Sequence, residues 1–221
     1  MNRIQQIYKI MIEAYGKQGW WPTTPENELR PRHLGKAPEN EKDRFEIIAG
    51  AILTQNTSWS NVEKAVFNLN KSKLIDIAKI KKTNIRKLAS LIRPSGYYNQ
   101  KAERLKIVAD FLAKNKNPTR EQLLGVKGIG PETADSILLY AFRKPFFVID
   151  AYTKRVFSRI GACKPDIRYD DLQNLFIQAL PKSTNIYKEY HALIVELAKR
   201  HCRTKPDCKD CPLSRLCEKR I

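Results

Sequence analysis

Two segments of the chain carry residues whose types and spacing could do chemistry. The first is the run HCRTKPDCKDCPLSRLC near the C-terminus, which places four of the five cysteines on one short loop: Cys202, Cys208, Cys211 and Cys217. Four thiolates this close together are typical of a metal site, and zinc or a [4Fe–4S] cluster would each accept four sulfur ligands. Unrelated free cysteines would favour the apolar core, whereas these stand among Lys, Arg, Asp and Pro. The spacing by itself favours zinc slightly.

The second segment, VKGIGPETADSILLYAFRKPFFVID, holds a glycine-rich turn followed by a single carboxylate, Asp150. The turn consists of Lys127, Gly128, Ile129 and Gly130. Its glycines let a ligand approach the backbone closely, and the amides at the start of the next helix can hold a phosphate. An ordinary connection between two helices is the alternative, and for Asp150 the alternative is a plain helix N-cap.

The charge balance indicates a polyanionic partner. The chain of 221 residues has 41 Lys and Arg against 23 Asp and Glu, a formal net charge of +18. Such an excess is costly self-repulsion unless a polyanion relieves it, so nucleic acid is the first candidate and a membrane surface the second. No apolar run approaches the roughly 20 residues that span a bilayer, and the N-terminus MNRIQQIYKI has no signal-peptide core. We therefore expect a cytoplasmic, nucleoid-associated protein whose glycine-rich turn grips a nucleic-acid backbone.

The elements that would position these residues have helical patterns almost throughout, so the predicted fold class is all-α. Residues 60–63, SNVE, have the pattern of a capping box that would open a helix, and residues 23–42 are rich in Pro, Glu and Asn, as in a long connector. Helical spacing of apolar residues occurs at 45–55, 64–69, 75–80, 84–91, 101–112, 121–124, 131–142, 151–161, 169–180 and 187–202.

Several segments together carry a resemblance to a known family. The segments LLGVKGIGPETADSILLYAF and VIDAYTKRV resemble the helix–hairpin–helix and the aspartate-bearing loop of the endonuclease III superfamily of DNA glycosylases. AGAILTQNT, GYYNQKAERL and the cysteine loop resemble further signature segments of that superfamily. The resemblance implies a two-lobed, all-helical fold. Its expected parts are an N-terminal helix and connector at 1–44 that pack on the C-terminal lobe, a six-helix barrel at 45–147, and a C-terminal lobe at 148–221.

The same resemblance implies a partner, a cofactor and a catalytic residue. The partner would be damaged double-stranded DNA with its target nucleotide flipped out, and the enzyme would be a monomer that does not bind membranes. A [4Fe–4S] cluster is favoured over zinc, although five residues separate Cys202 from Cys208 where the best-known members have six. Asp150 would be the catalytic carboxylate, because breaking a glycosidic bond builds positive charge on the sugar.

One departure from the family pattern concerns strand cleavage. Members that also cut the strand carry a lysine two residues after the last glycine of the hairpin, and its amine forms a Schiff base with the sugar. Here that position is Glu132, so we expect a monofunctional glycosylase that uses water, although Lys127, Lys144 and Lys154 lie nearby in sequence. The alternatives are a bifunctional glycosylase and AP lyase acting on oxidised pyrimidines, and a helix–hairpin–helix module that only holds DNA.

Aromatic residues suggest which base would be removed. The motif GWWP, with Trp20, Trp21 and Pro22, and Phe45 at the start of the first barrel helix are similar to the base pocket of the type III 3-methyladenine glycosylases. The best-known member of that subgroup lacks the cluster. An alkylated purine is cationic, and electron-rich aromatic faces attract cations, whereas core packing is the alternative for each aromatic residue. Gln55 would either enter the gap left by the flipped base or cap a helix end.

Overall fold

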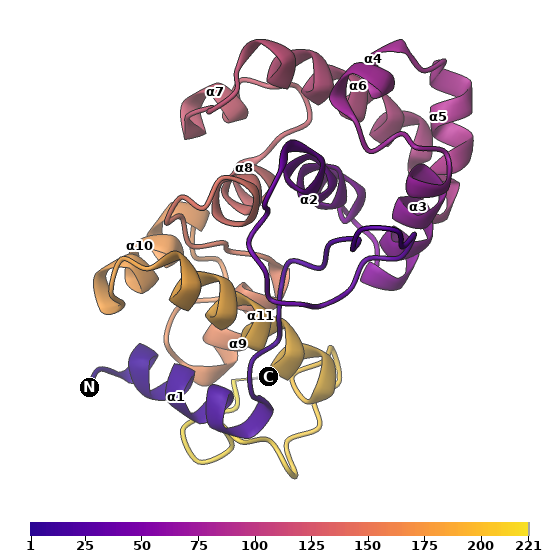
Figure 1. Cartoon of the computed structure of the whole chain (residues 1–221). Helices are drawn as coiled ribbons and strands as arrows, with labels where there is room; N and C mark the ends of the chain where they lie inside the picture. The colour runs from indigo at the N-terminus through magenta and orange to yellow at the C-terminus, as the bar shows by residue number, and fades with distance from the viewer. Residues whose placement is uncertain (221) are drawn as a thin grey trace. The chain divides into compact units, whose positions relative to one another are not determined.

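The computed structural model describes residues 1–220, and all of its regular secondary structure is helical apart from one antiparallel bridge between Thr23 and Arg32. The helices form two compact units, shown in Figure 1: one comprises Met1–Trp20 with the chain from Lys144 onward, and the other is Trp21–Arg143. Within the described residues, none of the helices is long and apolar enough to cross a membrane. The predicted all-α class is confirmed.

The unit Trp21–Arg143 is built around α2 (Glu41–Leu53), in which residues 45–53 are all buried. A helix that is buried on every side must be apolar all round, and this run is apolar except at Glu46. Helix α2 contacts α3, α6, α8 and a π-helical turn, η2. The other elements of the unit are α3 (Trp59–Lys71), α4 (Ile77–Lys82), α5 (Ile85–Leu91), η1 (Arg93–Ser95), α6 (Tyr98–Lys114), α7 (Arg120–Leu124), α8 (Pro131–Ser136) and η2 (Ile137–Ala141).

The carboxylate of Glu46 fastens the connector that precedes α2. Thr24 donates to Glu46 Oε1 from its backbone N and from its Oγ1, each at 2.7 Å. Asn70 of α3 donates to Glu46 Oε2 at 3.3 Å and to Thr24 Oγ1 at 2.8 Å. Burial raises the pKa of Glu46, and the hydrogen bonds from Thr24 and Asn70 oppose that rise. The connector therefore groups with α2, which differs from the predicted division at residue 44.

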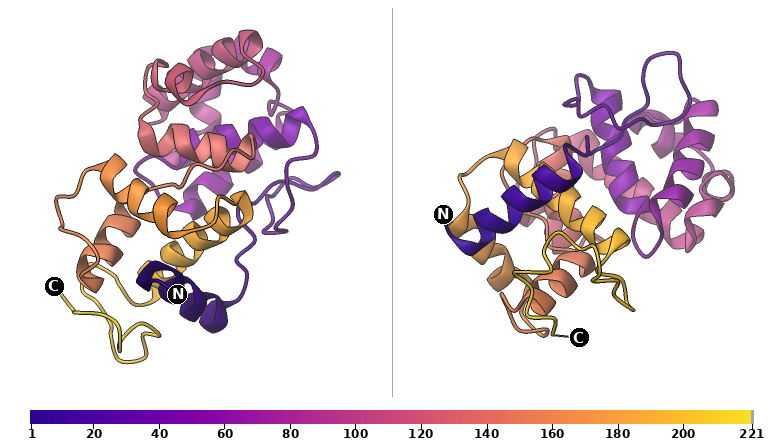
Figure 2. Two further views of the ribbon diagram at one scale, coloured as in Figure 1. Left: turned by 90° about the vertical axis from the view of Figure 1, so that its left-hand side faces the viewer. Right: turned by 90° about the horizontal axis from the view of Figure 1, so that it is seen from below.

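The other unit consists of α1 (Arg3–Tyr15), α9 (Ala151–Ile160), α10 (Tyr169–Ala179) and α11 (Thr184–Arg200). Helix α11 packs against α1 and α9, and Figure 2 shows the N-terminal helix among these C-terminal elements. Aromatic rings fill the core: the Phe147 and Phe176 rings stack with centroids 3.9 Å apart, and Tyr190 packs edge-on to both. Such pairs add to the burial energy of large rings.

Two local predictions need correction. The predicted capping box at residues 60–63 is wrong, because α3 begins at Trp59 and its N-cap is Ser58, two residues before Ser60. The Ser60 hydroxyl lies 2.9 Å from the Ser58 hydroxyl inside the first turn. The helix predicted to run on after Pro131 instead widens into η2, where the Phe142 amide donates to the Ile137 carbonyl at 3.2 Å.

Replacing Glu46 by Ala should lower the free energy of unfolding by about 2 kcal/mol, because the buried donors of Thr24 and Asn70 lose their acceptor. Glu46→Gln should cost less, since its amide oxygen still accepts from Thr24. Chemical denaturation measures both effects, with Glu103→Ala on the exposed surface of α6 as the matched control. If Glu46→Ala matched that control, the connector would not depend on this carboxylate.

Candidate functional site

The glycine-rich turn joins α7 to α8 as a helix–hairpin–helix, and we call residues 126–130 the hairpin. Gly128 has φ +88°, a left-handed conformation that favours glycine, and a Cβ there would lie 2.7 Å from Nε of Arg104. Gly130 has φ −92° and open space at its Cβ position. Val126 and Ile129 are buried beneath the turn, while both glycines are exposed. The backbone of the hairpin is therefore held from one side and open on the other.

An ion pair that the sequence analysis missed braces the two helices of the hairpin. Arg120 of α7 donates from Nε to Asp135 Oδ1 at 2.7 Å and from Nη2 to Oδ2 at 3.1 Å. The Asp135 side chain is fully buried, and a bidentate pair fixes both position and angle. Nothing in the spacing of the two residues signals this pair, because it forms only once the chain has turned back.

Gln55, predicted to enter DNA or to cap a helix, is tied to the hairpin in this structure. Its Nε2 donates to the Gly128 carbonyl at 3.1 Å and to Thr133 Oγ1 at 3.0 Å. Its Oε1 accepts from the Arg104 guanidinium. Entry into a DNA gap would require Gln55 to exchange these partners, so the predicted wedge role remains a prediction. What the geometry establishes is that Gln55 and Arg104 support the backbone of Gly128.

Asp150 lies at the start of α9, where one of its oxygens caps the helix. Its Oδ1 accepts from the backbone N and from Oγ1 of Thr153, each at 2.7 Å. Its side chain is only 13% exposed. Burial would raise the pKa of Asp150, but a hydrogen bond and the charge of His191, with the bonds from Thr153, outweigh it and lower the pKa below the ordinary value. Asp150 is thus an anion held in a sheltered place, and the predicted cap is present.

His191 of α11 is the residue beside Asp150 that the sequence analysis missed. Its Nε2 lies 3.5 Å from Asp150 Oδ2, and its side chain is also 13% exposed. A histidine inside the helical segment YKEYHALIVELAKRHC, which also holds His201, gives no signal by spacing. Only the packing of α11 against α9 brings it to the carboxylate.

The lysines differ in how available their amines are. Glu132 is exposed in the first turn of α8, at the position that corresponds to the Schiff-base lysine of the strand-cutting family pattern. Lys127 is exposed, and Lys144 and Lys154 are half-buried. Burial lowers the pKa of Lys101 to about 8, with Arg104 adding to the effect, which is the kind of shift that activates an amine. However, Lys101 is fully buried and donates to the carbonyls of Leu53 and Ser95 at 2.8 and 2.7 Å, so its role is structural.

The aromatic residues predicted for the base pocket have separate surroundings. The Trp21 ring packs edge-on to Trp59 and Tyr140, with centroids 5.7 and 5.2 Å away, and lies against Gly50 of α2. Phe45 is 1% exposed and borders a hollow lined by residues of α2, α4 and α6. Positions 45 and 50 point about 140° apart on an α-helix. The structure therefore does not bring Trp21 and Phe45 together as the two walls of a base sandwich.

Trp20 and Pro22 flank Trp21 and differ in exposure. Pro22 is buried, whereas Trp20 is half-buried. The ammonium of Lys199 lies 5.9 Å from the centroid of the Trp20 ring, near the outer limit of a cation–π contact. One face of Trp20 thus already attracts a cation.

The four cysteines of the C-terminal loop, Cys202, Cys208, Cys211 and Cys217, line one pocket beside α11. Among the described residues, no three His, Cys, Asp or Glu side chains stand at the spacing of a metal-bound group. Burial raises the pKa of the Cys211 thiol, and the charges of the other three cysteines raise it further. The four sulfurs therefore lie within electrostatic reach of one another without being drawn together at ligand distances.

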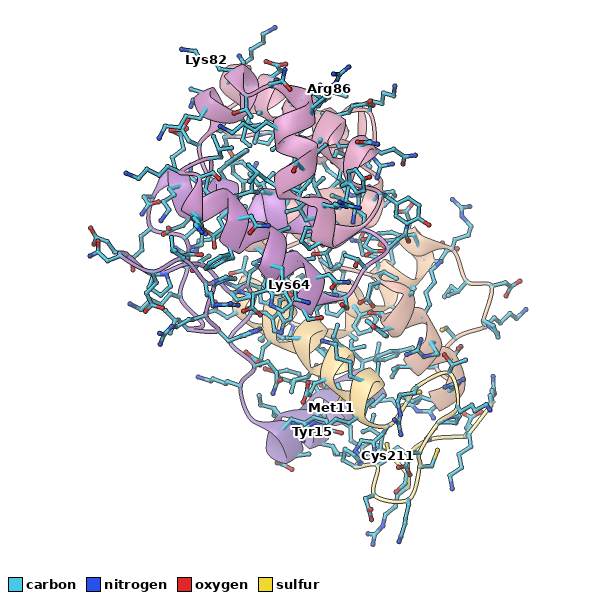
Figure 3. The ribbon with its side chains drawn as sticks, turned by 90° about the vertical axis from the view of Figure 1, so that its right-hand side faces the viewer. Met11, Tyr15, Lys64, Lys82, Arg86 and Cys211 are labelled. Atoms are coloured by element: carbon cyan, nitrogen blue, oxygen red, sulfur yellow. The ribbon has the colours of Figure 1, made fainter. Side chains whose placement is uncertain are left out.

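Hydrogen-bond donors surround this cysteine pocket. The Lys219 amide donates to Cys217 Sγ at 3.3 Å, and Arg159 Nη1 donates to Cys202 Sγ at 3.6 Å. The buried Tyr15 hydroxyl has no hydrogen-bond partner among the described residues. Its pKa is raised to about 12, mainly by burial and to a smaller extent by Cys211. Figure 3 labels Tyr15 and Cys211 in this unit. Donors and a buried hydroxyl without a partner around four thiols fit a negatively charged, sulfur-ligated group.

Comparisons with known proteins agree with this architecture. Residues 49–182 match the family described as HhH-GPD superfamily base excision DNA repair protein. A Methanocaldococcus jannaschii protein provisionally named DNA repair glycosylase MJ1434 is 45% identical over 227 residues, covering 97% of this chain and 95% of that protein.

Two solved structures share the fold. The crystal structure of the H. pylori 3-methyladenine DNA glycosylase MagIII, bound to 1,N6-ethenoadenine, is similar with a TM-score of 0.70 and 30% identity over 89% of this chain and 97% of that one. A non-covalent complex of endonuclease III with DNA gives a TM-score of 0.80 at 22% identity over 99% and 97%, which shows the fold alone. The predicted membership of the endonuclease III-like superfamily is confirmed. The family match over more than half of the chain, on a helix–hairpin–helix fold, shows that the protein belongs to the HhH-GPD superfamily of base excision DNA repair proteins and is a DNA glycosylase.

Proposed function

We propose that this glycosylase removes an alkylated purine, 3-methyladenine, from damaged double-stranded DNA by hydrolysis and leaves the strand uncut. The observation that carries the hydrolytic role is Asp150, which stays ionised although it is mostly buried. A carboxylate in a sheltered place stabilises developing positive charge more strongly than one in water. Its bonds to Thr153 fix its orientation before any substrate arrives.

The chemistry assigned to Asp150 is electrostatic. As the bond between C1′ and the base nitrogen breaks, its electron pair leaves with the cationic base, which departs neutral, and positive charge develops on the sugar. The Asp150 anion stabilises that charge while a water molecule adds to C1′ and loses a proton to the solvent. Because its pKa is lowered, Asp150 is better suited to stabilising the cation than to storing a proton.

The absence of strand cleavage is inferred from the amines that the hairpin offers. Glu132 stands at the lysine position, and a carboxylate cannot form an imine. Lys101 has the lowered pKa of an activated amine, but its ammonium donates hydrogen bonds to two carbonyl groups in the core. Among the lysines predicted as substitutes, Lys127 is the exposed one, and it lies within the hairpin itself.

The substrate proposal depends on relatives and on one aromatic face. The chain is 30% identical to a 3-methyladenine glycosylase that was solved with a purine derivative bound. Trp20 is half-buried and has the Lys199 ammonium 5.9 Å from its ring centroid, and an electron-rich indole is the kind of ring that attracts a cationic purine. Trp21, Pro22 and Phe45 are buried in the structure, which leaves Trp20 as the aromatic residue that this proposal favours.

We also propose that Cys202, Cys208, Cys211 and Cys217 hold a [4Fe–4S] cluster. Four cysteine thiolates on one loop can ligate such a cluster, and hydrogen bonds to the sulfurs tune it. The amide of Lys219 and the guanidinium of Arg159 already point at two of these sulfurs. When bound, the cluster would supply a cross-link that orders the loop, since metal binding is coupled to folding.

Alanine substitutions at the two glycines of the hairpin distinguish an effect on the backbone fold from an effect on phosphate contact. Gly130→Ala should fold like the wild type, because its φ is negative and its Cβ would enter open space. If the hairpin grips phosphate closely at this point, Gly130→Ala should weaken binding to undamaged duplex about tenfold, measured by fluorescence anisotropy. Gly128→Ala should instead lower thermal stability, because its Cβ would strike Arg104. Wild-type affinity for Gly130→Ala would place the phosphate contact elsewhere.

Incubation with a lesion panel tests the activity itself. Methylated duplex should release 3-methyladenine, while duplexes with uracil or thymine glycol should stay intact, and strand breaks should appear only after alkali.

Asp150→Asn should bind DNA but lose excision, since a neutral amide cannot offset sugar cation charge. Borohydride should trap no covalent adduct. Robust trapping, or release of thymine glycol without 3-methyladenine, would favour the bifunctional enzyme instead.

Metal analysis tests the cysteine site. The purified protein should be brown and contain iron with inorganic sulfide. Serine replacement of any one of Cys202, Cys208, Cys211 or Cys217 should reduce both, whereas Cys163→Ser should leave them unchanged, because Cys163 lies outside that pocket. Removing the iron should expose the loop to protease. One zinc per chain with no iron would replace the cluster by a structural zinc site.

A further inference from the structure

The two oxygens of Asp150 have different partners. Oδ1 receives both hydrogen bonds from Thr153, at 2.7 Å each, and these alone satisfy the N-cap of α9. Oδ2 faces His191, whose Nε2 lies 3.5 Å away. The contact with His191 is therefore not needed to cap the helix. It involves Oδ2, the oxygen that takes no part in the cap.

The pair is also sheltered from water. Each side chain is 13% exposed, so their interaction is screened less than that of surface groups. Burial opposes the charge on Asp150, and among the effects that lower its pKa the hydrogen bond from His191 is the largest. The imidazole thus does more than Thr153 to keep the carboxyl ionised.

The fold does not depend on this contact. Helices α9 and α11 pack against each other. Arg155 of α9 also donates from Nε to the Cys202 carbonyl, just beyond α11, at 2.8 Å. Removing the imidazole should therefore leave these elements in place and change chiefly the freedom and charge environment of Oδ2.

We propose that His191 is a positioning residue for glycosidic bond cleavage: it donates from Nε2 to Asp150 Oδ2 and holds that oxygen ready to face the sugar cation. The proposal rests on the catalytic role proposed for Asp150. In the transition state the sugar cation is stabilised by a carboxylate oxygen whose orientation is already fixed. The carboxylate therefore does not need to reorient as the charge develops. Without the donor, Oδ2 would rotate or recruit water, and the stabilisation would weaken.

Two substitutions at position 191 test the role. His191→Leu removes the donor while keeping an apolar volume, and His191→Gln places an amide N–H at a reach similar to that of Nε2. Single-turnover release of 3-methyladenine from methylated duplex gives the chemical rate. Affinity for a duplex with a tetrahydrofuran abasic analogue gives binding, and thermal unfolding reports the fold. His33→Leu, at an exposed histidine of the connector, is the matched control.

The expected pattern separates positioning from structure. His191→Leu should slow release by about tenfold or more, with abasic-duplex affinity and melting temperature close to the wild type. His191→Gln should recover most of the rate. Release at the wild-type rate by His191→Leu would overturn the proposal, as would equal slowing in both variants accompanied by loss of affinity and stability.

Failure of the proposed function has a different signature. If the wild type releases another base of the lesion panel, the same comparison is made with that base, and the proposal for His191 stands or falls there. If Asp150→Asn releases the base as fast as the wild type, Asp150 is only a helix cap, and the role of His191 falls with it.

Discussion

Helix α2 imposes the constraint on which the unit Trp21–Arg143 depends: a polypeptide segment buried on every side must find internal partners for each of its polar groups. Residues 45–53 are all buried. The Glu46 carboxylate is therefore satisfied by Thr24 and Asn70, and this fixes the path of the connector. At the far end of α2 the Leu53 carbonyl accepts from the buried Lys101 ammonium.

The residues that follow α2 extend the same constraint to the hairpin. Gln55 lies just past the end of the helix and donates to the Gly128 carbonyl, while Arg104 contacts the other end of the Gln55 amide. The absence of a side chain at Gly128 leaves room for Arg104 to lie against the turn. The start of α8 is thus backed by a helix whose own contacts are buried. A rigid support of this kind suits a surface that must grip a backbone regardless of sequence.

In the other unit, a balance between burial and hydrogen bonding decides the state of Asp150. Desolvation alone would favour the neutral acid. His191 and Thr153 reverse that preference by surrounding the carboxylate with donors, and the result is a lowered pKa. The same residue is an N-cap and a sheltered anion, so the structural and the catalytic interpretation do not compete: Oδ1 caps the helix, whereas Oδ2 faces His191.

The helical class, the helix–hairpin–helix with its glycines, the place of Asp150 and the grouping of four cysteines could all be predicted from the amino-acid sequence, because each is encoded by residues close together in the chain. Apolar periodicity, turn chemistry and short spacing are local properties that survive without knowledge of packing. By contrast, packing brings His191 to Asp150 and Arg120 to Asp135. Packing also sets Trp21 against Gly50, on a different face of α2 from Phe45. The residues in these contacts belong to different helices or segments, so their spacing in the sequence predicts no contact. The contacts form only when the helices pack in the folded chain. The base pocket predicted from GWWP and Phe45 depended on such packing, which is why the sequence alone could not decide whether these residues lie together.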